Sequence, residues 1–254
     1  MNKIIVAKDK IISDNCEGVE INDNTLKITS DLEIYIIYEN SSITFLNVDI
    51  LENRKVKIYE FISSNKLDIT YNLKENSTVN LYRFAHQLST LKTVINLNGI
   101  NAKIDFNFAN IGSNNSKYLI SVNHNAKGVK SNVVNHGLAL NNSFLDYTVE
   151  SILPTSINEV VMEQITKVVL LGNSSSKVEP IMYINHDDVI GKHGNTIGKF
   201  NDDEIFYLMS RGISKNEAIK LLIKGFIFAI IEGNLNFRED ILKIILKVGG
   251  ENDE

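Results

Sequence analysis

The sequence predicts a mainly β protein with a helical C-terminal tail. Between about residues 31 and 150, short apolar runs begin ten to fifteen residues apart and end in polar turns, as in LDITYNLKEN and IDFNFANIGSNN. This spacing is too short for the crossover helices of an α/β fold. After residue 200, three segments carry helix-start signals instead. We therefore expect a β core over residues 1–199 and a helical domain over residues 200–254.

Apolar and polar residues alternate within the runs, as expected for strands with one buried face. In the run 67–73 the residues that share this face are Leu67, Ile69, Tyr71 and Leu73. The turns repeat Glu39-Asn40, Glu52-Asn53 and Glu75-Asn76, and asparagine tolerates the left-handed backbone conformation. This weak periodicity suits a solenoid, but a β-sandwich or barrel would give the same spacing, so the pattern leaves both open.

Three helices are predicted after residue 200, each from a polar N-cap residue followed three residues later by glutamate. The candidate caps are Asn201, Ser214 and Asn236. Gly212 and Gly233 lie where helix ends favour a positive φ. The second helix is apolar on almost every side over residues 225–231, so we expect it to pack on the β core, on its neighbours or on another protein. Within the third helix, Glu239 and Lys243 are spaced as a favourable pair.

Composition excludes several classes of protein. The net charge of −5 comes from intermixed acidic and basic residues without a basic stripe, so we expect no nucleic-acid binding. A single cysteine, Cys16, cannot form an internal disulfide and indicates a reducing, cytoplasmic setting. It lies in the polar stretch SDNCEG, where we expect a surface thiol. Lys224 interrupts the most apolar run, so we expect no membrane span.

One dense polar stretch, His186-Asp187-Asp188, invites a metal-site interpretation. Imidazole and carboxylate can hold a divalent metal, which makes His186 and Asp188 weak candidate ligands. Neighbours on a strand point to opposite faces, however, and a hydrogen-bonded turn is the simpler interpretation. No nucleophile–base or carboxylate pair is recognisable, so we expect no enzymatic activity. The other histidines along the β runs are expected to be exposed or hydrogen-bonded: His86, His124 and His136.

The stretch from SSSKVEPIMYINHDD through GKHGNTIGKF to FYLMSRGI and AIKLLIKGF resembles the C-terminal core of the SufB/SufD family of iron–sulfur cluster assembly proteins. The matching residues are Glu179-Pro180, Tyr183, Asp187-Asp188-Val189, His193-Gly194, Thr196, Gly198, Phe206-Tyr207-Leu208, Ser210-Arg211-Gly212-Ile213, Ala218, Leu221, Leu222 and Phe226. The match is strong over residues 174–231 and loose upstream. Gly194 follows the histidine where SufB-type sequences carry glutamate, which makes the chain SufD-like.

The resemblance implies a fold, a role and partners. The fold would be a right-handed parallel β-helix, or β-solenoid, with a C-terminal helical domain. The role would be that of a scaffold or interaction subunit, with a SufC-type ATPase docked on the C-terminal helices and a SufB-like paralogue or a second copy as the other partner. The docking residues would be Phe206, Tyr207, Arg211, Leu222 and Phe226. His193 matches the histidine that the family associates with the nascent cluster at the SufB–SufD interface.

The chain also departs from the family pattern. Gly191 stands where the family carries cysteine, two residues before His193, and a chain with one cysteine cannot hold a cluster alone. We therefore expect no tightly bound cofactor and at most a transient iron–sulfur cluster shared with a partner. The chain is shorter than typical members, and we expect no N-terminal helical region. The alternative function is a free-standing β-solenoid that binds proteins and has lost the cluster role.

Overall fold

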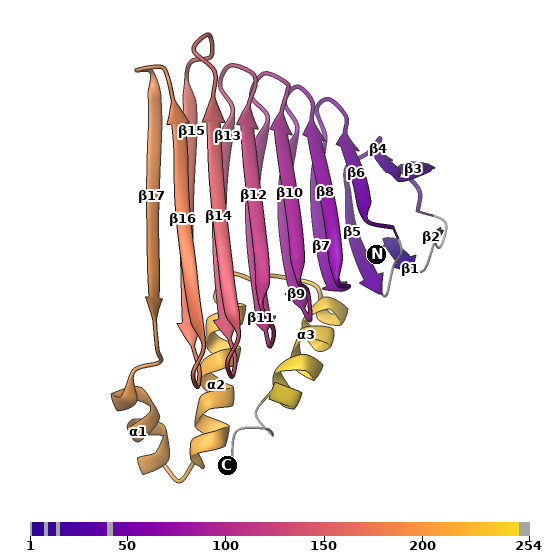
Figure 1. Cartoon of the computed structure of the whole chain (residues 1–254). Coiled ribbons are helices and arrows are strands. Elements are labelled where there is room, and N and C mark those ends of the chain that lie inside the picture. Colours follow the sequence, from indigo (N-terminus) through magenta and orange to yellow (C-terminus); the bar gives the residue numbers. More distant parts are fainter. Residues whose placement is uncertain (1, 8–9, 14–15, 40–42, 249–254) are drawn as a thin grey trace.

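The computed structural model describes residues 2–7, 10–13, 16–39 and 43–248 and shows a β-solenoid followed by three helices (Figure 1). Sheet A contains, in spatial order, β17 (Val189–Gly198), β15 (Val160–Leu170), β13 (Lys130–Ala139), β11 (Lys103–Gly112), β9 (Thr78–His86), β7 (Lys55–Ser63), β5 (Leu32–Glu39), β1 (Asn2–Ala7) and β2 (Lys10–Ser13). Sheet B contains β16 (Ser175–Ile184), β14 (Phe144–Leu153), β12 (Ser116–His124), β10 (Thr90–Leu97), β8 (Lys66–Leu73), β6 (Phe45–Ile50), β4 (Thr25–Ile28) and β3 (Val19–Asn22). The helices are α1 (Asp202–Ser210), α2 (Lys215–Phe228) and α3 (Leu235–Val248).

The strand order identifies the solenoid. From β4 onward, successive strands alternate between the two sheets, and each pairs in parallel with the strand two positions along the chain. Antiparallel pairs join β1 to β2 and β3 to β4 at the N-terminal end. A sandwich of hairpins would give antiparallel ladders throughout, so the β-solenoid prediction is confirmed.

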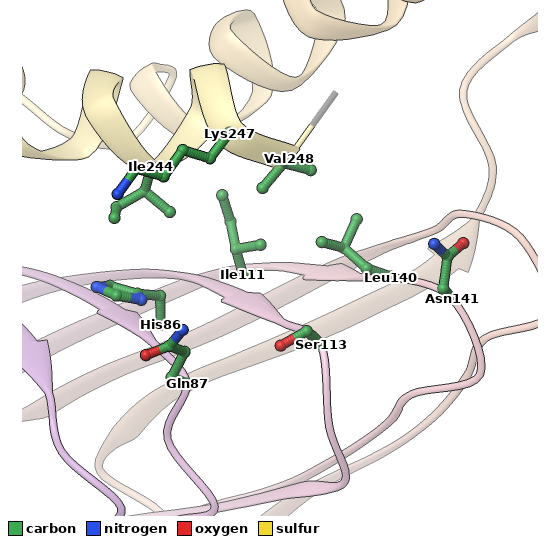
Figure 2. Close-up of a pocket in the computed structure, with 9 residues that line it drawn as sticks. All are labelled: His86, Gln87, Ile111, Ser113, Leu140, Asn141, Ile244, Lys247 and Val248. Atoms are coloured by element: carbon green, nitrogen blue, oxygen red, sulfur yellow. The ribbon is translucent and has the colours of Figure 1, made fainter. Parts of the chain in front are cut away.

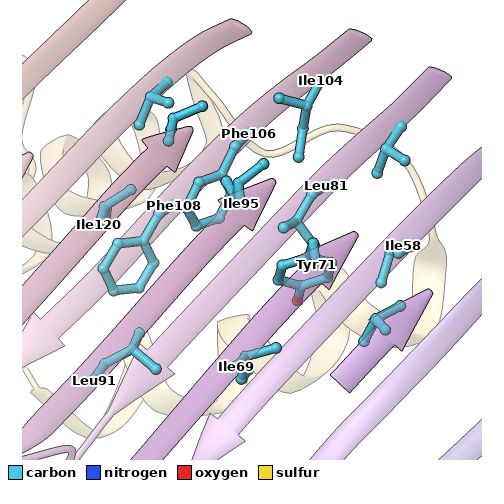
Figure 3. Close-up of a cluster of buried hydrophobic side chains, with 14 of the residues drawn as sticks. Ile58, Ile69, Tyr71, Leu81, Leu91, Ile95, Ile104, Phe106, Phe108 and Ile120 are labelled. Carbon is cyan, nitrogen blue, oxygen red and sulfur yellow. The ribbon is translucent and has the colours of Figure 1, made fainter. Parts of the chain in front are cut away.

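The main core lies between the two sheets (Figure 3). It consists of side chains at alternate positions of the strands, which point inward. The predicted face of β8 is buried in it, since Leu67, Ile69, Tyr71 and Leu73 are all fully buried. Stacked coils place similar side chains above one another, as for Tyr118 of β12 and its partner Tyr147 of β14, whose ring centres lie 4.8 Å apart. Burial of these residues stabilises the solenoid through the hydrophobic effect.

A second apolar cluster lies on the outer face of sheet A and is covered by α2 and α3 (Figure 1). Here buried and exposed residues no longer alternate. The strands β5, β7, β9, β11 and β13 each contain, toward their C-terminal ends, a run of consecutive buried residues, as in IYIIY of β5. From the helices, Ile223, Ile227 and Ile231 of the α2 segment and Phe237, Ile241 and Ile245 of α3 complete the cluster. The predicted packing of the second helix on the β core is confirmed.

Asparagine turns stack along one edge of the solenoid. Asn53, Asn76 and Asn101 have positive φ values of 60°, 53° and 59°. The amide of Asn76 donates to the side-chain oxygen of Asn53, and Asn101 donates to Asn76, both at 3.2 Å. Asparagine therefore supplies both the left-handed conformation and a ladder between coils. Asn40 of the first predicted turn lies outside the described residues.

A buried ion pair interrupts the apolar core between β7 and β9. Arg83 Nε lies 2.6 Å from Glu60 Oε2, and both side chains are fully buried. Tyr38 and Tyr71 donate their hydroxyls to Glu60, and Arg83 also donates to Thr93 Oγ1 at 2.6 Å. Burial opposes the charge on Arg83, but Glu60 and the neighbouring hydroxyls hold the pKa of its guanidinium above the ordinary value.

The helix boundaries follow their caps with one exception. Asn201 accepts from the backbone of Asp203, and Ser214 forms a full capping box with Glu217. The third predicted cap is wrong: α3 already begins at Leu235, and Asn234 accepts from the Phe237 N–H at 3.2 Å. Asn234 follows the positive-φ Gly233 directly, so the chain turns two residues earlier than predicted.

Two smaller predictions are corrected. Cys16 is buried rather than on the surface, with 8% exposure, because its Sγ donates to the carbonyl oxygen of Lys3 on β1 and the N-terminal strand covers it. Lys243 pairs at 2.7 Å with Asp240, one turn away, rather than with Glu239. Among the described helices, none is long and apolar enough to span a membrane.

Candidate functional site

The C-terminal end of the solenoid is formed by β16 and β17, the last strands of sheets B and A (Figure 1). A last strand presents backbone N–H and C=O groups that another chain can pair with. Pro180, which has no N–H, lies in β16, where an edge strand tolerates it. Four large apolar side chains of this end are exposed: Tyr183, Ile184, Ile190 and Ile197. This end is therefore an open surface suited to a β-rich partner.

His193 lies in the middle of β17 and is exposed. Its Cα pairs with that of Gln164 on β15, so the two side chains lie on the same face of sheet A. Gln164 is buried, which identifies this as the inner face. Both residues line a groove of about 630 Å³ together with Thr166 and Asn195. The predicted cluster-interface ligand thus stands in a groove at the open end of the solenoid.

Gly191 precedes His193 by two residues and lies on the same inner face, paired with Met162. A Cβ at this position would lie 3.2 Å from Ile184 Cδ1 and 3.4 Å from Met182 Sδ, both on β16. A cysteine here would therefore be held between the two sheets, beside His193. With glycine, this position offers no thiolate, and Cys16 lies at the opposite end of the solenoid. Sulfur ligands for a cluster at His193 would have to come from another molecule.

The interior next to this groove is polar. Gln164 donates through Nε2 to Ser151 Oγ at 2.7 Å, and Asn135 donates to Thr166 Oγ1 at 3.0 Å. The side-chain oxygens Gln164 Oε1 and Asn135 Oδ1 are buried without a hydrogen-bond partner among the described residues. Buried acceptors of this kind are normally satisfied by water or by a ligand.

The weak metal candidates form a turn between β16 and β17. The Asp188 N–H donates to His186 Nδ1 at 3.0 Å, and Asp188 Oδ2 accepts from the Glu159 N–H at 3.2 Å. These bonds continue the stacked turns of the earlier coils, in which Glu159 also has a positive φ. In the described part of the chain, no group of three or more histidine, cysteine or acidic side chains could hold a metal ion.

The five predicted docking residues divide into two groups. Phe206, Tyr207 and Arg211 are exposed around α1, and Phe206 is 72% exposed. The Arg211 guanidinium lies 5.3 Å from the centre of the Tyr207 ring. Leu222 and Phe226 of α2 are half-buried, and Phe226 packs against the apolar cluster on sheet A. The exposed apolar face of this region also includes Met209 and Leu221.

A second hollow, of about 460 Å³, lies between α3 and the nearby ends of the sheet A strands (Figure 2). Ile111, Leu140 and Ile244 provide apolar walls, and His86 and Lys247 place nitrogen atoms beside it. Burial and the charge of Lys247 lower the pKa of His86. Sequence reasoning missed this hollow, since its two sides are more than a hundred residues apart.

His124 and His136 are both hydrogen-bonded, which agrees with the expectation for these two residues. Since a carbonyl oxygen can only accept, His124 donates from Nδ1 to Ile152 O at 3.2 Å and its Nε2 accepts from Ser131 at 2.8 Å. Burial lowers the pKa of His124 to about 4. His136 donates to the carbonyl oxygen of Phe226 at 2.7 Å and stacks on its ring at 4.4 Å. His136 thus fastens α2 to sheet A.

The family described as SUF system FeS cluster assembly, SufBD core domain, matches residues 5–226, which include β17 and α1. The chain belongs to the SufBD family. The iron-sulfur cluster assembly protein SufD of Bacillus subtilis (strain 168) is 26% identical over 121 residues, which cover 47% of this chain and 28% of that SufD. SufD of Escherichia coli (strain K12) is 34% identical over 90 residues, covering 34% and 21% of the two chains.

A third SufBD relative is ycf24 of Galdieria sulphuraria, described as an iron-sulfur cluster assembly SufBD family protein. It is 30% identical over 104 residues, covering 41% of this chain and 47% of ycf24. Each of these alignments spans less than half of the relative's own length. The resemblance stated from the sequence is confirmed at the level of the family, and SufD proteins are among the similar chains.

Proposed function

We propose that this SufBD protein is a SufD-like component of an iron–sulfur cluster assembly complex in the cytoplasm. It would act as a scaffold and interaction subunit rather than as an enzyme. The observation that carries the proposal is the position of His193, exposed in a groove on the last strand of an open solenoid end. Membership of the SufBD family supports a role for this position in iron–sulfur cluster assembly.

The open end would bind a second solenoid, either a SufB-like paralogue or another copy of this chain. Edge strands pair readily with other edge strands, and the exposed apolar residues of β16 and β17 would be buried in such an interface. His193 would then face the partner and contribute an imidazole nitrogen to a transient cluster. The partner would supply the thiolates, because the position of Gly191 cannot.

The α1 surface would bind a SufC-type ATPase. Phe206 and Tyr207 expose aromatic rings, and the Arg211 guanidinium lies over the Tyr207 ring. Aromatic residues and arginine are enriched at protein interfaces, and tyrosine and arginine at binding hot spots. Leu222 and Phe226 would border the surface with their exposed parts, while the buried part of Phe226 holds α2 on sheet A.

A charge placed on the α1 surface tests the ATPase proposal. Phe206→Glu should weaken binding of the co-expressed ATPase by at least about tenfold, since loss of an interface hot spot costs about 2 kcal/mol or more and about 1.4 kcal/mol is tenfold. The melting temperature should stay unchanged, because the Phe206 side chain contributes little to the core at 72% exposure. Phe45→Glu is the matched control: Phe45 is 53% exposed on β6, in the solenoid and far from α1 in the chain.

Phe45→Glu should leave ATPase binding unchanged. Equal ATPase binding by wild type and Phe206→Glu would refute this docking surface. A folded wild-type chain that binds neither a SufC-type ATPase nor a SufBD paralogue would instead favour the free-standing, protein-binding solenoid.

A further inference from the structure

Gln164 carries a buried amide oxygen for which the described residues provide no hydrogen-bond partner. The residue is 1% exposed. Its Nε2 donates to Ser151 Oγ at 2.7 Å and to the carbonyl oxygen of Ile181 at 3.3 Å. Because a carbonyl oxygen can only accept, these bonds fix which end of the amide is the nitrogen. Oε1 is therefore an oriented acceptor whose burial without a partner is unfavourable.

The ring of His193 is a candidate donor on the same face. Gln164 and His193 are direct partners in the parallel ladder of β15 and β17, and both line the groove at the open end. Side chains of directly paired residues leave the sheet about 5 Å apart. The contact inferred below therefore involves rotation of the His193 side chain and no change in the paired backbone.

We propose that Gln164 is a positioning residue for His193, whose ring N–H it accepts through Oε1. This bond fixes one neutral tautomer of the imidazole and leaves the other ring nitrogen pointing into the groove. Histidines that bind metals almost always donate their second nitrogen to such an acceptor, which orients the ring. The inference deepens the proposed function, since it rests on His193 being a ligand to cluster iron.

The tautomer of His193 tests the bond without any cluster. Long-range ¹H–¹⁵N spectra of the full ¹⁵N-labelled chain at about pH 8, where an ordinary imidazole is neutral, report both ring nitrogens. A His193→Ala variant identifies the His193 signals. In the wild type we expect one dominant tautomer and a ring N–H proton that exchanges slowly with water. Comparable populations of both tautomers with fast exchange, as in a solvated imidazole, would overturn the inference.

Variants separate positioning from general packing. Gln164→Met keeps the length of the side chain but removes Oε1, and should shift the His193 tautomer ratio at least fivefold toward equal populations. Gln164→Glu retains an acceptor oxygen and should restore the wild-type tautomer. Met162→Leu, on the same strand and inner face but without a hydrogen-bonding group, is the matched control and should leave the tautomer ratio unchanged. A folded Gln164→Met protein with the wild-type ratio would overturn the inference; if it fails to fold, the wild-type exchange rate and Gln164→Glu still decide.

Anaerobic binding of Fe²⁺ to the chain purified with its SufBD partner distinguishes this inference from the proposed function. We expect about 10–100-fold weaker Fe²⁺ binding in Gln164→Met, the range typical for loss of a ligand's hydrogen-bond partner. Fe²⁺ binding that needs His193 but is equal in both proteins would overturn the positioning role and support the ligand role. A locked tautomer in a complex that does not bind Fe²⁺ would support the Gln164 bond and remove the ligand role.

Discussion

The buried pair of Glu60 and Arg83 gives the sharpest test of how the solenoid core is held together. Arg83→Met replaces the guanidinium with an apolar side chain and leaves a fully buried carboxylate with two hydroxyl donors, Tyr38 and Tyr71. Breaking a buried pair by removing one partner costs about 3–5 kcal/mol. Glu60→Gln removes the opposite charge and should cost a similar amount, since the Arg83 charge is then buried without a counterion.

The double variant tests whether the two buried charges depend on one another. Glu60→Gln with Arg83→Met leaves no buried charge, while glutamine can still accept from the two tyrosines. We expect the double variant to cost no more than either single variant, which corresponds to a coupling free energy of about 3 kcal/mol between the two sites. Urea unfolding followed by far-UV circular dichroism measures all four proteins. Costs that simply add in the double variant would show that the two charges do not depend on one another and would refute the reasoning.

Three further predictions follow from single contacts. Burial lowers the pKa of His124 to about 4, so the unfolded chain takes up a proton at a higher pH than the folded chain. The contribution of His124 to the free energy of unfolding should be full above about pH 6.5 and fall by roughly 3 kcal/mol as the pH drops toward 4. His124→Gln should flatten this decline in urea unfolding, and an unchanged slope would contradict the prediction. Asn76→Ala should cost about 1–2 kcal/mol and Asn76→Gly less, because the backbone φ of 53° is strained for alanine; equal melting temperatures of the two variants would contradict this. Phe226→Ala should cost about 2 kcal/mol, roughly half the value for a fully buried phenylalanine, through the loss of its packing on His136 and sheet A; an unchanged melting temperature would show that Phe226 does not anchor α2.

The strands of sheet B were predictable because they follow one rule along their whole length. One face is buried and the other is not, so the alternation in Leu67, Ile69, Tyr71 and Leu73 maps directly onto the structure. The ends of the sheet A strands break the rule, since α2 and α3 bury their second face. Which strands a helix covers depends on the tertiary fold and cannot be read from the local sequence. A run such as IYIIY is compatible with either a doubly buried strand or a buried helix. The solenoid itself followed from the family resemblance rather than from spacing.

The site was predictable at one residue and not at its surroundings. His193 could be identified from the family motif, and the missing thiolate from Gly191. The partner position of Gln164 depends on the length of the coil, since 29 residues separate paired positions in β15 and β17, compared with 23 in β7 and β9. Coil length varies with each turn, so no fixed repeat gives the register. Burial of Cys16 likewise depends on a contact with Lys3 that local composition does not reveal.

We propose that the chain works within an iron–sulfur cluster assembly complex. Removing residues 200–254 would be a poor test, because α2 and α3 cover an apolar face of sheet A and their loss would expose it. The direct measurement is native mass spectrometry of the full chain co-expressed with the SufC-type ATPase and the SufBD paralogue of the same organism. We expect one stable assembly that contains this chain, the ATPase and a second SufBD subunit, which is either the paralogue or another copy. A folded chain recovered alone, with the ATPase and the paralogue assembled without it, would contradict the claim.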